Sequence, residues 1–211
     1  MLVALLVLLP RSSFTLPPAI ARLLTPAPTA TPQPGHFTAG QWVQVAGPPV
    51  QTAEYYDLLA SPVDPLTAYT CTIPVPSDPS SPYSARPVTV WVTHDGGVRW
   101  TQAALPPIMG TACEVSPARD GSHRVTLSVT DDVLDQHAQA CAHSQYFLSE
   151  DDGATWRRLQ HPSIAPPISQ SGVCTLSAAG HHLYVSASVY NDNQGRSFLE
   201  RSDDGGLSWA R

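Results

Sequence analysis

The octapeptide SEDDGATW, at residues 149–156, has near-copies on both sides along the chain. THDGGVRW occupies residues 93–100, and SDDGGLSW occupies residues 202–209. In each copy a hydroxyl residue is followed two positions later by aspartate, four positions later by glycine and seven positions later by tryptophan. The question is whether this acidic repeat carries chemistry or holds a fold together.

Every position of the octapeptide has a structural role in a tight hairpin. The aspartate side chain accepts hydrogen bonds from backbone N–H groups just ahead of it, and the glycine takes a positive φ. The flanking hydroxyl residues close further local hydrogen bonds, while the tryptophan starts the outgoing strand and covers the turn. The pattern therefore predicts a turn that stabilises the fold.

Four tryptophans, Trp42, Trp100, Trp156 and Trp209, recur at separations of 58, 56 and 53 residues. After each of the first three comes a similar tail: WVQVAGPP, WTQAALPP and WRRLQHPSIAPP. These tails read as strands that end at proline, which cannot donate to a ladder. The spacing indicates a structural repeat.

Short alternating or β-branched runs fill each repeat, including VTVWVT, RVTLSVT and HLYVSASV. No window keeps a helical period of apolar residues, and Gly, Pro, Asp and Ser punctuate the runs. The sequence predicts an all-β fold of about three four-stranded antiparallel repeats, arranged as the blades of a β-propeller.

The octapeptides resemble the Asp box, or BNR repeat, of sialidase-like β-propellers. The second copy fits the pattern fully, the third has Ser208 where the second has Thr155, and the first has Arg99 there. In that family the boxes lie on the outer rim, away from the central cleft. The resemblance implies a structural role for these residues: Thr93, Asp95, Gly97, Trp100, Ser149, Asp151, Gly153, Thr155, Trp156, Ser202, Asp204, Gly206, Ser208 and Trp209.

The motif names a fold and no reaction. A sialidase of the family needs three arginines, a tyrosine nucleophile with a glutamate, and an aspartate acid/base, and the nearest match to its early arginine motif is Arg86-Pro87. Glu54 and Glu114 are candidate bases, and Tyr55, Tyr56 and Tyr69 are candidate nucleophiles, but no spacing selects them.

We expect a non-catalytic module that binds a glycan or protein ligand through loops such as 77–84 and 131–141. The alternative is a sialidase-like exo-glycosidase whose catalytic residues lie partly outside this chain.

Three repeats are fewer than the four or more blades of a closed propeller. The sequence therefore predicts an incomplete ring, which further blades or another chain would close. With 211 residues, 42% of them hydrophobic, the chain can bury a core. Its formal net charge of -6 and lack of a basic cluster argue against nucleic acid as a partner.

Four cysteines allow three pairings. Cys71 and Cys113 flank the first octapeptide, and Cys141 and Cys174 flank the second. This order predicts the disulfides Cys71–Cys113 and Cys141–Cys174, each joining one blade to the start of the next.

Two histidine groups are candidate metal ligands. His137, Cys141 and His143 are close in sequence, but zinc sites usually have tighter paired spacings, so we expect a solvated insertion loop there. The adjacent His181 and His182 flank a turn and a strand, where adjacent side chains point to opposite faces. We predict no metal and no cofactor.

The apolar run MLVALLVLLP at the N-terminus is too short to span a bilayer. It is either a short signal peptide, cut after the pattern at residues 19–21, or the end of a longer membrane anchor. Both place the rest outside the cytoplasm, secreted or tethered at the cell surface, as do the cysteines. The predicted division is a signal or anchor remnant at 1–24, a Pro/Thr linker at 25–35 and repeats at 36–211, with units at about 43–100, 101–156 and 157–211.

Overall fold

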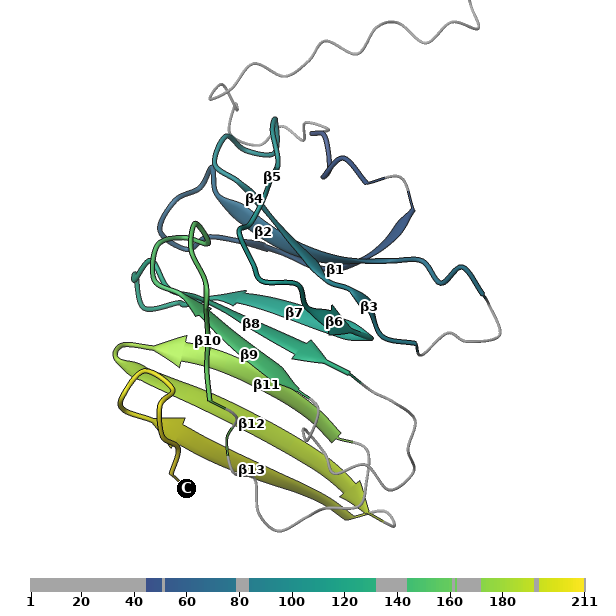
Figure 1. Cartoon of the computed structure of the whole chain (residues 1–211). Coiled ribbons are helices and arrows are strands. Elements are labelled where there is room, and N and C mark those ends of the chain that lie inside the picture. The colour runs from purple at the N-terminus through teal and green to yellow at the C-terminus, as the bar shows by residue number, and fades with distance from the viewer. Residues whose placement is uncertain are drawn as a thin grey trace, which may run out of the picture. The chain divides into compact units, whose positions relative to one another are not determined.

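The computed structural model describes residues 45–50, 52–78, 84–131, 144–160, 162, 172–191 and 194–210. Within these ranges all regular structure is β-strand, and none is helix. Three antiparallel sheets follow one another in chain order (Figure 1). The predicted all-β architecture of propeller blades is confirmed.

The first sheet has the order β1-β2-β4-β5, formed by β1 (Ala53–Ala60), β2 (Ala68–Pro74), β4 (Thr89–Thr93) and β5 (Thr101–Gln102). The central strands are rich in β-branched residues and are almost entirely buried, as suits a sheet covered on both faces. A bulge in β1 lies between Tyr56 and Leu58, where Asp57 has a φ of 37°. Because a bulge leaves its extra residue unpaired, Asp57 is outside the ladder.

The second sheet repeats this plan in the order β10-β9-β8-β7. Its strands are β7 (Ala112–Pro117), β8 (Val125–Thr130), β9 (Gln145–Ser149) and β10 (Arg157–Arg158). As in the first sheet, the octapeptide connects the third strand to a short outer strand.

The described residues of the third sheet form β11 (Gly172–Ala179), β12 (His182–Asn191) and β13 (Gln194–Ser202). Ala210, the last described residue, pairs with Arg201 at a bridge, in the register that Thr101 has with Val92 and Arg157 with Leu148 in the first two sheets. Arg201 and Ala210 each donate the backbone N–H to the carbonyl of the other, at 2.7 and 2.8 Å.

A small two-stranded sheet, which the sequence pattern does not predict, joins β3 (Arg86–Pro87) to β6 (Met109–Gly110). Two residues per strand are too few for a period-2 pattern to be visible, and Pro87 lacks a backbone donor. This sheet pairs the segment before β4 with the segment that leads into β7.

The core consists of two clusters, one on each side of the second sheet. Alternate residues of β9 belong to different clusters. Phe147 belongs to the cluster shared with the first sheet, while Tyr146 and Leu148 belong to the cluster shared with the third. Successive strand residues point to opposite faces, so one strand contributes to both clusters.

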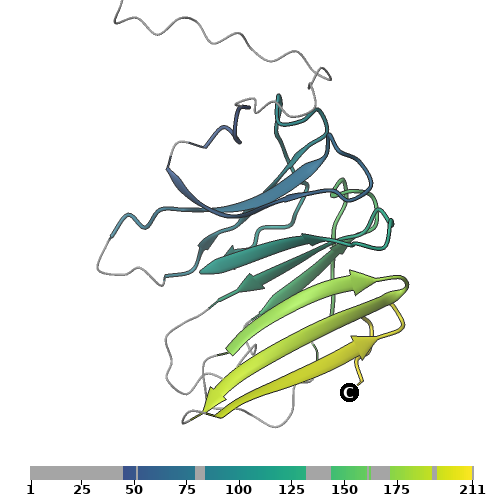
Figure 2. The same cartoon turned by 180° about the vertical axis from the view of Figure 1, so that it is seen from behind.

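The first strands of the sheets are neighbours, since β7 contacts both β1 and β11. Seen from behind, the sheets keep this order (Figure 2). Between the second and third sheets, Thr126 donates its hydroxyl to the carbonyl of Leu176 at 3.0 Å, and the backbone N–H of Leu176 donates to Ser128 Oγ at 3.0 Å. Hydroxyl side chains of β8 therefore satisfy the backbone of β11.

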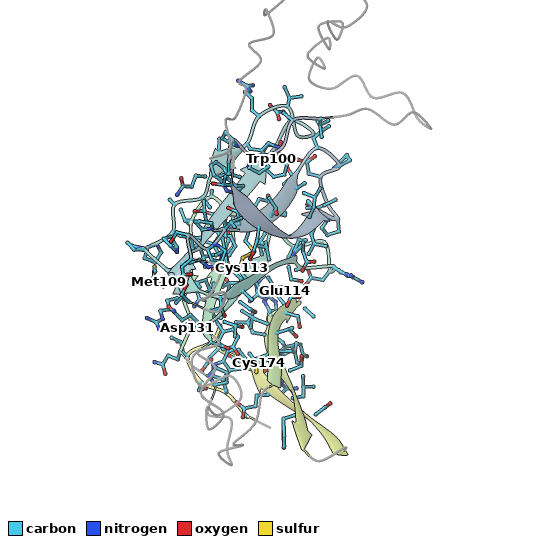
Figure 3. All side chains as sticks on the ribbon, turned by 90° about the vertical axis from the view of Figure 1, so that its right-hand side faces the viewer. Trp100, Met109, Cys113, Glu114, Asp131 and Cys174 are labelled. Carbon is cyan, nitrogen blue, oxygen red and sulfur yellow. A yellow bond between two sulfur atoms is a disulfide. The ribbon has the colours of Figure 1, made fainter. Side chains whose placement is uncertain are left out.

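A disulfide joins Cys71 on β2 to Cys113 on β7, with Cα atoms 6.3 Å apart, so it links the first two sheets. Cys113 and its neighbour Glu114 are labelled in Figure 3. Cys174 is 5% exposed on β11. Its predicted partner Cys141 lies outside the described residues, so this pairing stays a prediction, as does the division of the chain into domains.

Candidate functional site

All three octapeptides have the same hydrogen-bonded core. The leading hydroxyl donates to the aspartate Oδ1 at 2.8–2.9 Å, and the glycine N–H donates back to that hydroxyl at 2.7–2.9 Å. The backbone N–H four residues after the aspartate donates to the same Oδ1 at 2.8–2.9 Å. Two consecutive residues with positive φ close each turn: Gly96 and Gly97, Asp152 and Gly153, and Gly205 and Gly206.

The second carboxylate oxygen is also used within each turn. Thr155 and Ser208 donate their hydroxyls to Oδ2 of Asp151 and Asp204. In the first octapeptide Arg99 takes this role, donating its Nε–H to Asp95 Oδ2 at 3.1 Å. The departure at Arg99 therefore keeps the bonding pattern with a different donor.

These bonds favour the ionised aspartates. The side-chain and backbone bonds from Thr155 hold the pKa of Asp151 below its ordinary value, and those from Ser208 do the same for Asp204. The backbone N–H of Arg99 has the largest such effect on Asp95. The three carboxylates are engaged inside their own turns, which supports the predicted structural role.

The first and third octapeptides also hold an outgoing segment from the preceding repeat. Trp100 Nε1 donates to the carbonyl of Ala46 at 2.8 Å, and Trp209 Nε1 donates to the carbonyl of Gln160 at 3.0 Å. A Cβ added to Gly97 would come within 2.8 Å of Val45. A Cβ on Gly206 would come equally close to Leu159, so glycine permits this close packing.

The second octapeptide differs at the position before its glycine. Asp152 has a φ of 54° where the other copies have glycine. Its carboxylate accepts from the Tyr69 hydroxyl at 3.3 Å and lies 2.6 Å from His123 Nδ1. Trp156 Nε1 bonds within its own turn, to Gly153 O at 2.9 Å.

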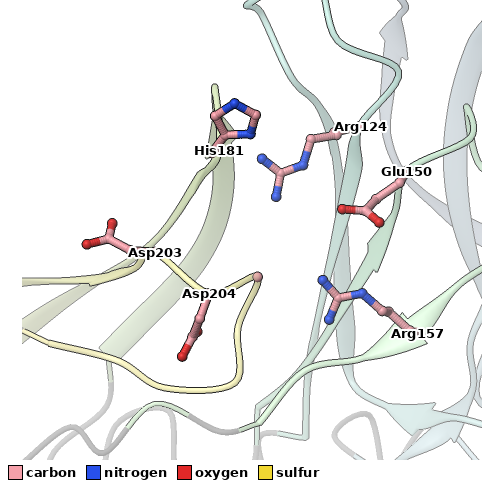
Figure 4. Close-up of a pocket in the computed structure, with 7 residues that line it drawn as sticks. Arg124, Glu150, Arg157, His181, Asp203 and Asp204 are labelled. Carbon is pink, nitrogen blue, oxygen red and sulfur yellow. The ribbon is translucent and has the colours of Figure 1, made fainter.

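A cavity of about 450 Å³, here called the interblade pocket, lies between the second and third sheets. It is at the end of the sheets where the octapeptides lie, and its walls come from four connecting segments and the start of β10 (Figure 4). The lining residues are Arg124, Glu150, Arg157, His181, Asp203, Asp204 and Gly205.

Two arginines of the second sheet dominate the interblade pocket, and Figure 4 shows both guanidinium groups directed into it. Arg124 donates through NH1 to the carbonyl of Gly180, while its buried Nε has no hydrogen-bond partner in the described part of the chain. Within the same ranges, neither Arg124 nor Arg157 forms an ion pair with an acidic side chain. The guanidinium of Arg157 and the terminal donors of Arg124 that do not bond Gly180 are therefore available to a ligand.

The acids of the interblade pocket differ in what they already bind. Asp203 lies 2.6 Å from His182 Nδ1 and accepts from Arg201 at 2.8 Å, and these contacts, that of Arg201 foremost, lower its pKa. Asp204 is engaged within its octapeptide and points away from the arginines (Figure 4). Glu150 is exposed, and in the described ranges it makes neither a hydrogen bond nor an ion pair.

Gly205 gives Arg157 its place in the interblade pocket. A Cβ added at Gly205 would lie 2.8 Å from Arg157 NH2, and the φ of +73° disfavours any L side chain there. The turn of the third octapeptide therefore approaches the guanidinium as closely as a backbone without a side chain allows.

The candidate carboxylates on the first strands lie elsewhere. Glu54 on β1 forms an ion pair with Arg86 at 3.6 Å. Glu114 on β7 is half-buried, and burial, followed by the charge of Asp57, raises its pKa. Arg86, the nearest match to the family's arginine motif, thus contacts Glu54 and the carbonyl of Pro74.

Other sequence candidates are placed as follows. Tyr69 is fully buried, and burial raises its pKa, so its hydroxyl is a poor nucleophile. His181 is in the turn before β12 and lines the interblade pocket. His182, the first residue of β12, lies 2.6 Å from Asp203, which lines the same pocket.

His137, Cys141 and His143, with most of the loops 77–84 and 131–141, lie outside the described residues. Among the residues that the structure does describe, no group of His, Cys, Asp and Glu is arranged to hold a metal.

Sequence reasoning singled out Glu150 only as part of an octapeptide and missed Arg124, Arg157, Asp203 and Gly205. The signal in the sequence was the position of a residue relative to the tryptophan of its repeat. Leu159 packs on Gly206, so the residues that follow one tryptophan lie beside the turn of the next octapeptide. Arg157, directly after Trp156, is in this position.

Comparison of the sequence with protein-family models and with curated proteins found no match. Among solved structures, the chain is similar to the α-L-arabinofuranosidase Arb93A of Fusarium graminearum in complex with an iminosugar inhibitor. The identity is 15%, the match covers 80% of this chain and 51% of that one, and the TM-score is 0.44. YCF48 bound to D1 peptide matches with 13% identity, 79% and 45% coverage and a TM-score of 0.39. The chain spans about half the length of these structures, and neither match assigns it a ligand or an activity.

The N-terminal run predicted as a signal or anchor lies outside the described residues. Within the described ranges, no helical segment has the length and hydropathy of a membrane span.

Proposed function

We propose that this chain is a non-catalytic β-propeller module that binds an anionic group of a carbohydrate or protein ligand in the interblade pocket. One observation carries the proposal: two guanidinium groups without acidic partners enter one cavity. A ligand site needs a few convergent polar groups in a concave space of some hundreds of Å³, and the interblade pocket has both.

The chemistry of arginine favours an anionic ligand group. A guanidinium presents its N–H donors in a planar fork that matches a carboxylate, and charge-assisted bonds of this kind are stronger than neutral ones.

The same proposal includes the setting that the sequence predicts. The disulfide between Cys71 and Cys113 supports an extracytoplasmic location, secreted or tethered through the N-terminus. The resemblance of the octapeptides to the Asp box supports membership of the sialidase-like propellers. In this view further blades or another chain complete the ring.

Binding can be measured by NMR with D-glucuronate and with N-acetyl-aspartate α-amide, which present a carboxylate on a sugar and on a peptide. We expect both to shift the backbone amide signals of Gly180 and Gly205, which flank the two guanidinium groups. Arg157→Gln should weaken binding about tenfold or more, as loss of one charge-assisted contact predicts.

Arg158→Gln is the matched control. Arg158 is the next residue of β10, is equally exposed and carries the same charge, but does not line the interblade pocket. Equal loss of binding in the two variants would indicate a general charge effect and contradict the proposal.

Glu114 supports glycoside hydrolysis as a second candidate function. A half-buried carboxyl group with a raised pKa, close to a second carboxylate, is the environment of a general acid. If Glu114 has this role, the chain should hydrolyse a p-nitrophenyl glycoside and Glu114→Gln should abolish hydrolysis. A panel of such glycosides that shows no hydrolysis above the buffer rate would exclude this activity for the chain alone.

A further inference from the structure

We infer that Glu150 makes the interblade pocket selective for a monoanionic carboxylate that carries a hydrogen-bond donor, and against dianions such as sulfate. This inference rests on the proposed function, since it concerns the ligand of the same pocket.

Arg124 and Arg157 supply two positive charges that no acid of the described residues pairs. Two of the three lining acids are already engaged: Asp203 by Arg201 and His182, and Asp204 by its own turn. Glu150 is the lining acid whose carboxylate accepts no hydrogen bond in the described residues, so it can face a ligand. Asp204 keeps its negative charge, because its bonds come from neutral donors, so the acids of the interblade pocket already offset much of the guanidinium charge and disfavour a dianion.

The placement of Glu150 gives it two effects on a ligand. It lies beside the two arginines on the wall formed by the second sheet, opposite Asp203 (Figure 4). An anion held by the guanidinium groups is thus close to the Glu150 carboxylate, which repels it in proportion to its charge. A carboxylate can also only accept hydrogen bonds, so Glu150 favours a ligand with an O–H or N–H beside its anionic group.

The carboxylate itself fits the arginine pair better than a point charge would. Arg157 is exposed and forms no ion pair in the described residues, so two parallel N–H donors of its guanidinium can bind both oxygens of a carboxylate. Arg124, held by its bond to the carbonyl of Gly180, directs the rest of its guanidinium toward the same space (Figure 4). Hydroxy-carboxylates of sugars and side-chain carboxylates of peptides share this chemistry, and the two probes separate these sources.

The experiment compares the dissociation constants of sulfate, D-glucuronate and N-acetyl-aspartate α-amide at fixed ionic strength for the intact chain. We expect the wild type to bind at least one carboxylate more tightly than sulfate. Glu150→Gln removes one unit of negative charge and should raise the affinity for sulfate relative to that for carboxylate about fivefold.

Asp78→Asn is the control, because it makes the same change of net charge at an exposed site between β2 and β3, outside the interblade pocket. The inference is overturned if Glu150→Gln leaves the affinity ratio unchanged, or if Asp78→Asn changes it equally. Failure of the proposed function looks different: Arg157→Gln would then bind every probe as the wild type does, or no probe would bind at all. Preference for one carboxylate probe over the other identifies the sugar or the peptide as the source.

Discussion

Trp209 donates its indole N–H to the backbone carbonyl of Gln160, a residue 49 positions earlier, at 3.0 Å. The backbone N–H of Gln160 in turn donates to the carbonyl of Gly206, at 3.1 Å. The third octapeptide is therefore bonded in both directions to the segment that leaves the second sheet. The indole of Trp100 makes the corresponding bond to Ala46.

Trp209→Phe keeps an aromatic ring but removes this interblade bond. We expect a loss of about 1 kcal/mol in the free energy of unfolding, the usual net value of one hydrogen bond. We also expect faster hydrogen exchange at the amide of Gln160, which mass spectrometry of the peptide containing it can measure. Trp156→Phe is the control, because its indole bonds within its own turn and should leave exchange at Gln160 unchanged.

Asp151→Asn should destabilise the second octapeptide. Asparagine keeps the size of aspartate but replaces one carboxylate oxygen with an NH2 group, which cannot accept a hydrogen bond. The oxygen lost is either Oδ2, which accepts from the Thr155 hydroxyl at 2.6 Å, or Oδ1, which accepts from two donors. We expect the Tm to fall by about 3 °C or more. Asp57→Asn, at an exposed site away from the octapeptides and at a positive φ that asparagine tolerates, should leave the Tm nearly unchanged.

Acid should destabilise the protein through the same aspartates. The pKa values of Asp95, Asp151 and Asp204 are lowered in the folded state, so each contributes stability that is present above its unfolded pKa near 3.8. That contribution is lost as the pH falls through the folded pKa. The Tm should therefore drop below about pH 4, and the drop should be smaller in Asp151→Asn. If the Tm of Asp151→Asn falls with pH as steeply as that of the wild type, Asp151 is not a source of the acid destabilisation.

Reduction of the disulfide between Cys71 and Cys113 should destabilise the first two sheets. The bond closes a loop with a sequence separation of 42, for which chain entropy predicts about 2 to 4 kcal/mol. Both sulfurs are buried, so the double variant Cys71→Ser/Cys113→Ser also introduces polar groups into the core. Urea unfolding of the Cys71→Ala/Cys113→Ala variant measures the effect of the disulfide without adding polar groups. A urea midpoint equal to that of the wild type would show that the disulfide does not stabilise the fold.

Gly205→Ala should weaken ligand binding as well as stability. The φ of +73° strains alanine, and its Cβ would displace Arg157 from the interblade pocket. Gly180→Ala is the matched control, because it has a φ of +57° but nothing within 4 Å of the added Cβ. Both variants should lose about 1 kcal/mol of stability, while only Gly205→Ala should move the side-chain signal of Arg157.

Much of the fold is predictable because its information is local. The octapeptide encodes its turn through residues at most seven positions apart, and a short continuous apolar run such as that of β9 predicts a strand buried on both faces. The first octapeptide keeps this turn despite a different residue, because Arg99, at the position of Thr155 and Ser208, also donates a hydrogen bond to the aspartate.

The interblade pocket was not predictable in the same way. Arg124, Glu150, His181 and Asp203 come from separate connections, and only the packing of the second sheet on the third brings them together.

The division of β9 between two clusters has a consequence for how the array comes apart. Loss of the first sheet exposes only the cluster that contains Phe147, and loss of the third exposes only the cluster that contains Tyr146 and Leu148. Loss of the second sheet exposes both. Where stability is a sum of nearest-neighbour terms, separating the second sheet from both of its described neighbours is therefore costlier than separating the first or the third sheet from the second.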